Sequence, residues 1–125
     1  MASSRPAALI VEDQPFVALV ASDILEEAGF EPLHACDATT ALALLRAHPE
    51  IEVMVTDVSL GRADDGVELA RSAALERPAL KLVVTASSTL GLSSELPSGA
   101  RLLHKPYASA ELRALVAGMA LLQPA

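Results

Sequence analysis

Five polar residues of this chain each stand at or just after the end of a short apolar run: Glu12, Asp13, Asp57, Thr85 and Lys105. Short apolar runs bounded by polar residues are typical of buried strands. In a parallel α/β sheet the carboxyl ends of all strands meet at one edge, where such folds place their sites. We therefore expect three carboxylates, one hydroxyl and one ammonium group to converge at one edge of a sheet.

Each of these residues has an ordinary explanation when it is taken alone. Glu12 and Asp13 could be a charge pair favoured by the dipole of a following helix. Asp57 could cap the loop after it, and Lys105 could be a solvated surface lysine. A site is the better interpretation because all of them occur together, at positions that one sheet edge would collect.

The composition indicates one α/β domain. A chain of 125 residues has the size of a single domain, and we expect residues 1–125 to form one. Hydrophobic residues make up 52% of the chain but aromatic residues only 2%, so the core must consist of Ala, Val, Leu and Ile. Such a core suits helices packed on a buried parallel sheet.

Charge and hydropathy exclude several classes of function. The net charge of -7 disfavours binding to phosphate backbones, so we expect no direct contact with nucleic acid. The single cysteine excludes an intramolecular disulfide, and no signal-peptide pattern or membrane-length apolar stretch is present. We therefore expect a cytoplasmic protein without membrane contact. The three histidines show no ligand spacing, and we expect them at the surface or at strand edges: His34, His48 and His104.

Apolar runs alternate with helix-like stretches five times. We expect strands at residues 7–12, 31–35, a run ending at 57, 80–85 and 100–104. The first helix should begin at Pro15 and end at Gly29, and Asp37 should cap the second helix, which stops before Pro49. Further helices are expected at 67–77 and 110–121. Between them, the serines and glycine after residue 87 favour a short or irregular fourth helix.

These residues resemble the receiver domains of bacterial two-component response regulators, and the resemblance covers essentially the whole chain. Glu12 and Asp13 match the acidic pair, Asp57 the phosphoacceptor, Thr85 the hydroxyl switch residue, and Lys105 with Pro106 the basic residue and its following proline. The resemblance implies a flavodoxin-like, doubly wound α/β fold, with a five-stranded parallel sheet in the order 2-1-3-4-5 flanked by five helices. Residues 23–30 and 103–107 look like those of stand-alone receivers, so we expect no output domain.

The resemblance also implies a cation at the site, Mg²⁺ or Mn²⁺. Phosphoryl transfer onto a carboxylate requires the negative charge of both partners to be neutralised. Asp13 and Asp57, together with Glu12 through water and the backbone carbonyl of Ser59, would form a suitable partial shell of hard oxygen ligands.

After transfer, Lys105 would pair with the phosphoryl oxygens. The Thr85 hydroxyl and the backbone N–H of Ala86 would hydrogen-bond the phosphorylated state better than the free state. Phosphorylation would thereby become a conformational signal.

Two features depart from the family pattern. Leu102 occupies the position, three residues before Lys105, where many receivers carry Tyr or Phe. The switch would then use another element, such as the segment 87–99 or Tyr107. The loop 61–66 also lacks the usual proline and carries two acids, which could slow the approach of anionic phosphodonors.

The resemblance implies a phosphoswitch that accepts its phosphoryl group on Asp57 from a histidine kinase or a phosphotransfer protein. Its enzymatic activity would be limited to slow self-phosphorylation from small donors and autodephosphorylation. A downstream protein would bind the face formed by the fourth helix, the fifth strand and the fifth helix, at about 88–121. Three leucines could contribute to that face: Leu90, Leu92 and Leu96.

Two alternatives come from other classes of protein. An aspartyl-phosphate hydrolase typically places a second Asp two residues after the nucleophile, and here that position is Ser59, which cannot act as a general acid at neutral pH. A phosphorylation-independent adaptor with a receiver fold is favoured by the missing aromatic residue, whereas the intact acidic pair argues against it.

Overall fold

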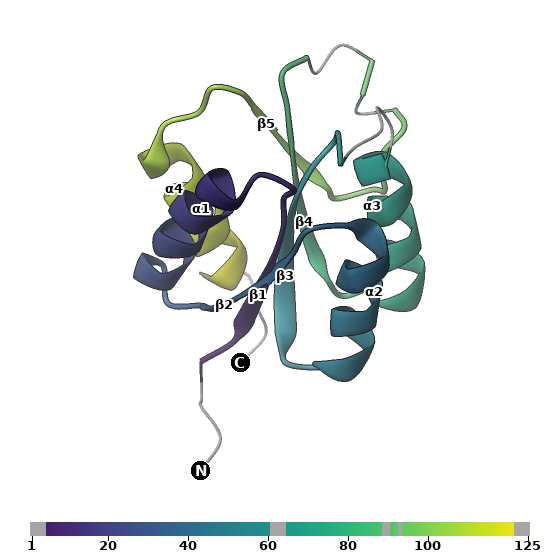
Figure 1. The fold of residues 1–125 in the computed structure, drawn as a ribbon, viewed down its shortest axis with the longest axis horizontal. Helices are drawn as coiled ribbons and strands as arrows, with labels where there is room; N and C mark the ends of the chain where they lie inside the picture. The colour runs from purple at the N-terminus through teal and green to yellow at the C-terminus, as the bar shows by residue number, and fades with distance from the viewer. Residues whose placement is uncertain (1–4, 61–64, 89–90, 93, 122–125) are drawn as a thin grey trace.

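The sheet has five parallel strands in the order β2-β1-β3-β4-β5, as predicted (Figure 1). The computed structural model describes residues 5–60, 65–88, 91, 92 and 94–121. The strands are β1 (Ala7–Val11), β2 (Glu31–Ala35), β3 (Ile51–Asp57), β4 (Lys81–Ala86) and β5 (Arg101–His104). All expected strands are therefore present, within one or two residues of their predicted ends.

The described residues contain four helices instead of the expected five. They are α1 (Pro15–Glu27), α2 (Ala38–Ala47), α3 (Asp65–Glu76) and α4 (Ser109–Leu121). Between β4 and β5, the residues that the structure describes form turns and bends. Gly91 and Gly99 in this connection have φ angles of 71° and 88°, which interrupt a right-handed helix. The prediction of a fourth helix between these strands was thus wrong for the described part of the segment.

The helix boundaries follow the expected local chemistry. Pro15 occupies the first turn of α1, where its missing N–H costs no hydrogen bond. Gly29 follows α1 with a φ of 100°, a left-handed conformation that favours glycine. At α2, the Asp37 carboxylate accepts a hydrogen bond of 2.7 Å from the Thr40 N–H. All three predicted helix-boundary signals are confirmed.

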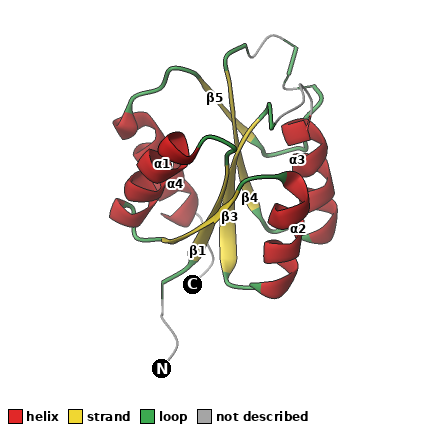
Figure 2. Cartoon of the chain, in the orientation of Figure 1, coloured by secondary structure: helices red, strands yellow, loops and turns green. Residues whose placement is uncertain are grey.

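Helices cover both faces of the sheet. Helices α1 and α4 lie on one face, and α2 and α3 lie on the other (Figure 2). Side chains of the strands alternate between these two layers, as their pleat requires. The layer under α2 and α3 includes Leu9, Leu45, Met54 and Leu69, and the layer under α1 and α4 includes Ile10, Leu25, Phe30 and Leu112. No helix in the described part of the chain has the length and apolar character needed to cross a membrane.

Gly66, in the first turn of α3, lies directly against the end of β3. Its N–H donates a hydrogen bond of 2.9 Å to the carbonyl oxygen of Val58. A Cβ atom at this position would lie 2.0 Å from the carbonyl oxygen of Asp57 and 2.6 Å from the Cα atom of Val58. A side chain here would force α3 and the residue at the end of β3 apart, so this close approach requires glycine.

We predict that Gly66→Ala destabilises the protein by about 1–3 kcal/mol, because the added methyl group clashes with backbone atoms that cannot move aside cheaply. Urea denaturation measures the change. Gly118→Ala is the matched control, since a Cβ at Gly118, in α4, meets nothing within 4 Å. The control should be neutral or stabilising by up to about 1 kcal/mol. Equal midpoints for both variants would contradict the close-approach argument.

Candidate functional site

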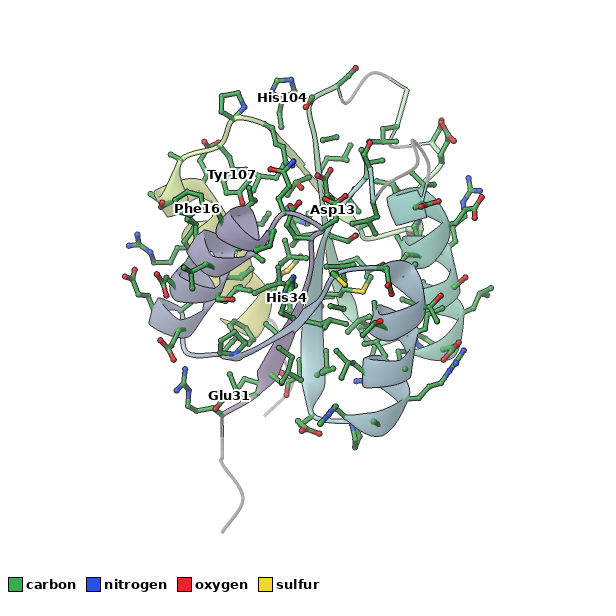
Figure 3. The ribbon with its side chains drawn as sticks, viewed as in Figure 1. Asp13, Phe16, Glu31, His34, His104 and Tyr107 are labelled. Atoms are coloured by element: carbon green, nitrogen blue, oxygen red, sulfur yellow. The ribbon has the colours of Figure 1, made fainter. Side chains whose placement is uncertain are left out.

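The predicted polar residues meet at the carboxyl edge of the sheet. Asp57 is the last residue of β3 and pairs in register with Thr85 on β4. Glu12 and Asp13 directly follow β1, which neighbours β3 on its other side, and Lys105 follows β5. Figure 3 shows Asp13 at this end of the sheet. The structure thus brings to one edge residues that lie far apart in sequence.

The centre of the site is an ion pair between Lys105 and Asp57. The Lys105 Nζ atom lies 2.7 Å from Asp57 Oδ2 and 4.0 Å from Glu12 Oε1. Desolvation works against the charge of Lys105, but the hydrogen bond and negative charge of Asp57, together with Glu12, outweigh it and raise the pKa of the ammonium. The Lys105 ammonium is therefore held in its charged form between two carboxylates.

Glu12 is the buried member of the acidic pair, with a relative exposure of 5%. Burial raises the pKa of its carboxyl group, and the charge of Asp57 and the neighbouring Asp13 act in the same direction. The N–H of Gln14 and the charge of Lys105 partly offset this effect. Asp13 is exposed instead. The two acids therefore present one carboxylate inside the site and one at its rim.

Hydrogen bonds fix the backbone around Asp57. The Ser59 N–H donates to Asp57 Oδ1 at 3.2 Å, and the Val58 N–H donates to the Thr85 carbonyl at 2.9 Å. The Lys105 N–H donates to the carbonyl of Ala86 at 2.8 Å. These bonds link the ends of β3, β4 and β5, so the positions of the charged side chains depend on one another.

Thr85 and Ala86 lie within β4 and are buried, with exposures of 3% and 0%. Thr85 lies opposite Asp57 in the parallel ladder, and the pair occupies adjacent strand ends. Thr85, which we predict to carry the switch hydroxyl, is thus next to Asp57, which we predict to be the phosphoacceptor.

The donor set suits a hard divalent cation. Glu12, Asp13 and Asp57 offer carboxylate oxygens, which Mg²⁺ and Mn²⁺ prefer, and Ser59 adds a backbone carbonyl close to Asp57 in sequence. Burial, aided by the charge of Asp57 and by the neighbouring Asp13, raises the pKa of Glu12, and a bound cation would favour its ionised form. Among the described residues, however, no group of three or more His, Cys, Asp or Glu side chains surrounds a common point.

One contact at this edge was missed by the sequence analysis. His34, on β2, places its Nε2 atom 2.9 Å from the carbonyl oxygen of Glu12. The two residues are 22 positions apart, so no spacing within the sequence indicates the contact. The prediction that His34 lies at the surface or at a strand edge holds, because its side chain is exposed on β2, the edge strand.

The predicted partner leucines need a correction. Leu92 is 9% exposed and packs with Val67 and Ala86, and Leu96 is partly buried against the same residues. The described residues between β4 and β5 form turns and bends, so Leu92 packs inward and Leu96 is only partly exposed. Leu90 lies outside the described residues. Leu102, at the position of the missing aromatic residue, is also partly buried against this cluster.

An apolar groove of about 430 Å³ runs beside the site. Its walls are Phe16 and Val20 of α1 and the residues from Lys105 to Tyr107 after β5. Phe16 is 75% exposed, although it is one of the largest apolar side chains of the chain. Figure 3 shows Phe16 and Tyr107 close together at the same end of the molecule as Asp13. The groove shares Lys105 with the charged site.

Comparisons with solved structures find the same architecture elsewhere. A response regulator receiver protein from Sinorhizobium medicae WSM419 is similar, with 26% identity, a TM-score of 0.83 and 95% of each chain covered. A sensor protein from Polaromonas sp. JS666 shares 28% identity, with a TM-score of 0.76 over 94% of this chain and 96% of that chain. A receiver domain from Methylobacillus flagellatus shares the fold at 24% identity and a TM-score of 0.78, over 93% of this chain and 99% of that chain.

No curated protein matches the chain. The family model for the response regulator receiver domain, in contrast, matches residues 8–117. That range contains the acidic pair, Asp57, Thr85 and Lys105, which the fold brings to one edge. The chain therefore belongs to the response regulator receiver domain family, whose members act in two-component signal transduction.

Proposed function

We propose that this protein is a phosphoswitch that accepts a phosphoryl group on Asp57 from the phosphohistidine of a kinase or phosphotransfer protein. The observation that carries the proposal is the placement of the Lys105 ammonium 2.7 Å from Asp57 Oδ2, beside the buried Glu12. A carboxylate that takes up a phosphoryl group gains negative charge, and a cation already aimed at it lowers the cost of that gain.

Transfer begins with an oxygen of the Asp57 carboxylate attacking the phosphorus of the donor. The new P–O bond forms as the P–N bond to the donor imidazole breaks, and the electron pair of that bond leaves with the nitrogen. Lys105 moves its hydrogen bond from Asp57 to a phosphoryl oxygen, so its charge remains paired. Mg²⁺ or Mn²⁺ bound by Asp13, Asp57, the Ser59 carbonyl and, through water, Glu12 would supply the remaining charge neutralisation.

The signal begins at Thr85 and Ala86, opposite the phosphorylated residue. Their hydroxyl and N–H groups would hydrogen-bond the phosphorylated state better than the free state, which is the differential interaction that a two-state surface needs. Ala86 packs against Leu92, and Leu96 and Leu102 surround the same cluster. A movement of β4 therefore reaches the β4–β5 connection through packed side chains, without an aromatic switch residue.

A downstream protein would then bind the face formed by β5, α4 and the β4–β5 connection. This face differs from the predicted one because its described part contains no helix before β5. The partner would then detect a shift in the packing of the β4–β5 connection rather than the rotation of a helix.

A protein donor would cover the apolar groove beside the site. The donor imidazole must come within bonding distance of Asp57, so the surface around it must meet the rim of the site. Phe16 at that rim is exposed and apolar, which suits a buried anchor in an interface.

We predict that magnesium and a small phosphodonor, such as phosphoramidate, add one phosphoryl group to the wild-type protein and none to Asp57→Asn. The amide at residue 57 cannot attack phosphorus as a carboxylate does. Intact-mass measurement detects the adduct, and a chelator-treated sample tests the need for the cation. An adduct on Asp57→Asn, or none on the wild type even with autophosphorylated kinases, would favour the phosphorylation-independent adaptor.

We predict that Thr85→Ala accepts the phosphoryl group but loses the conformational response, because Ala86 alone would report the phosphate. Hydrogen exchange of the amides between β4 and α4, compared with and without phosphorylation, measures the response. Wild-type protein should change in this connection. A full response in Thr85→Ala would show that the signal leaves the site by another route.

We predict that Phe16→Ala slows transfer from a protein donor by about ten-fold and leaves phosphorylation by phosphoramidate unchanged, since only the protein donor covers the groove. Leu75→Ala is the matched control, because Leu75 is an 85% exposed apolar residue on α3, on the other face of the sheet. Equal effects of the two substitutions would contradict the proposed docking of the donor.

A further inference from the structure

His34 contacts the backbone of Glu12 but belongs to none of the matched motif positions. It lies on β2, below Asp13 in Figure 3, and its Nε2 atom is 2.9 Å from the carbonyl oxygen of Glu12. A carbonyl oxygen can only accept a hydrogen bond, so the ring must donate through Nε2–H. The hydrogen bond to the Glu12 carbonyl therefore orients the imidazole ring of His34.

The contact lies where the ladder between β1 and β2 ends. Val11 and Ala35 are the last residues paired in that ladder. The N–H of Glu12 still donates to the Ala35 carbonyl at 3.0 Å, but β2 then gives way to the turn that Asp37 uses to start α2. His34 supplies a side-chain donor to the Glu12 carbonyl at the point where backbone pairing stops. Both backbone groups of Glu12 are thereby anchored to β2.

Anchoring Glu12 also constrains the next residue. Asp13 lies between this anchor and Pro15, the first residue of α1, whose φ is fixed by its ring. The segment between the two fixed points is only Asp13 and Gln14. The Glu12–Asp13 peptide plane contains the carbonyl that His34 holds, so rotation of that plane would move the Asp13 backbone and its carboxylate.

We infer that His34 is a positioning residue for the acidic pair, setting through the Glu12 carbonyl the orientation of the Asp13 carboxylate and hence the affinity for a divalent cation. The inference rests on the proposed function for the cation itself. Outer residues that orient metal ligands typically change metal affinity by 10-fold to 100-fold when they are lost. Here the ligand is oriented through its backbone, so we expect the lower end, about ten-fold.

The test compares Mg²⁺ affinity among variants of the full chain by calorimetric titration. His34→Leu removes the donor, and His34→Gln restores an N–H donor at a similar reach. His48→Leu is the matched control, because His48 is paired with Glu50 at 3.1 Å, just before β3 and hence at the opposite edge of the sheet. The thermal midpoint is measured for each variant, so that loss of folding is separated from loss of affinity.

We expect a Kd for Mg²⁺ about ten-fold higher in His34→Leu, near wild type in His34→Gln, and unchanged in His48→Leu. The rate of phosphorylation by phosphoramidate should fall at low Mg²⁺ and recover at saturating Mg²⁺, a split that a general loss of stability would not produce. If His34→Leu does not fold, His34→Ala replaces it as the variant without a donor, and its Kd for Mg²⁺ is compared with that of His34→Gln.

An unchanged Kd in folded His34→Leu or His34→Ala, with wild-type protein binding Mg²⁺ normally, would overturn the role of His34 and leave the phosphoswitch intact. Failure of His34→Gln to restore the affinity would overturn it as well. Wild-type protein that binds no Mg²⁺ would instead overturn the cation step of the proposed function, and the role of His34 with it.

Discussion

The parallel register of β3 with β4 is the constraint on which the site depends. It places Asp57 opposite Thr85, while the bonds from Val58 to Thr85 and from Lys105 to Ala86 tie the three strand ends together. The Lys105 ammonium can lie 2.7 Å from Asp57 only because β5 pairs in turn with β4. A slip of one residue in any of these ladders would turn every side chain of the shifted strand to the other face and separate the residues of the site.

The site combines charges that would be unfavourable if they were separated. Glu12 is buried and has a raised pKa, and it stays close to Asp57 because the Lys105 ammonium lies between them. Truncating one member of such a group leaves the others desolvated and unpaired. Substitutions at this edge therefore change both stability and chemistry, and the two effects have to be measured separately.

Much of the fold was predictable because strands and helix ends depend on local sequence. The apolar runs gave the strands, and Pro15, Gly29 and Asp37 marked helix ends through chemistry that acts within a few residues. The convergence of the site residues followed from parallel topology, although the sheet order itself came from the resemblance to a family. The strands, the helix ends and the convergence of the site residues could be predicted because short-range sequence patterns or a shared fold determine them.

The remaining features depend on contacts between distant segments. We expected Leu92 to contribute to the face of the fourth helix, fifth strand and fifth helix, yet the described connection is not helical and the side chain packs against Val67 and Ala86 instead. His34 meets Glu12 across 22 residues, and the need for glycine at Gly66 appears only once α3 is seated on β3. Periodicity carries no information about such packing, because it depends on three-dimensional neighbours.

Tyr107 gives the molecule a spectroscopic property. The chain contains one tyrosine and no tryptophan, so Tyr107 dominates its absorbance and fluorescence in the near ultraviolet. It is partly buried in the wall of the groove that it shares with Lys105. Burial raises the pKa of its phenol, the charges of Glu12 and Asp57 act in the same direction, and the charge of Lys105 partly offsets them. Tyr107 is thus a natural chromophore beside the charges of the site, and its spectrum can report changes there without an added label.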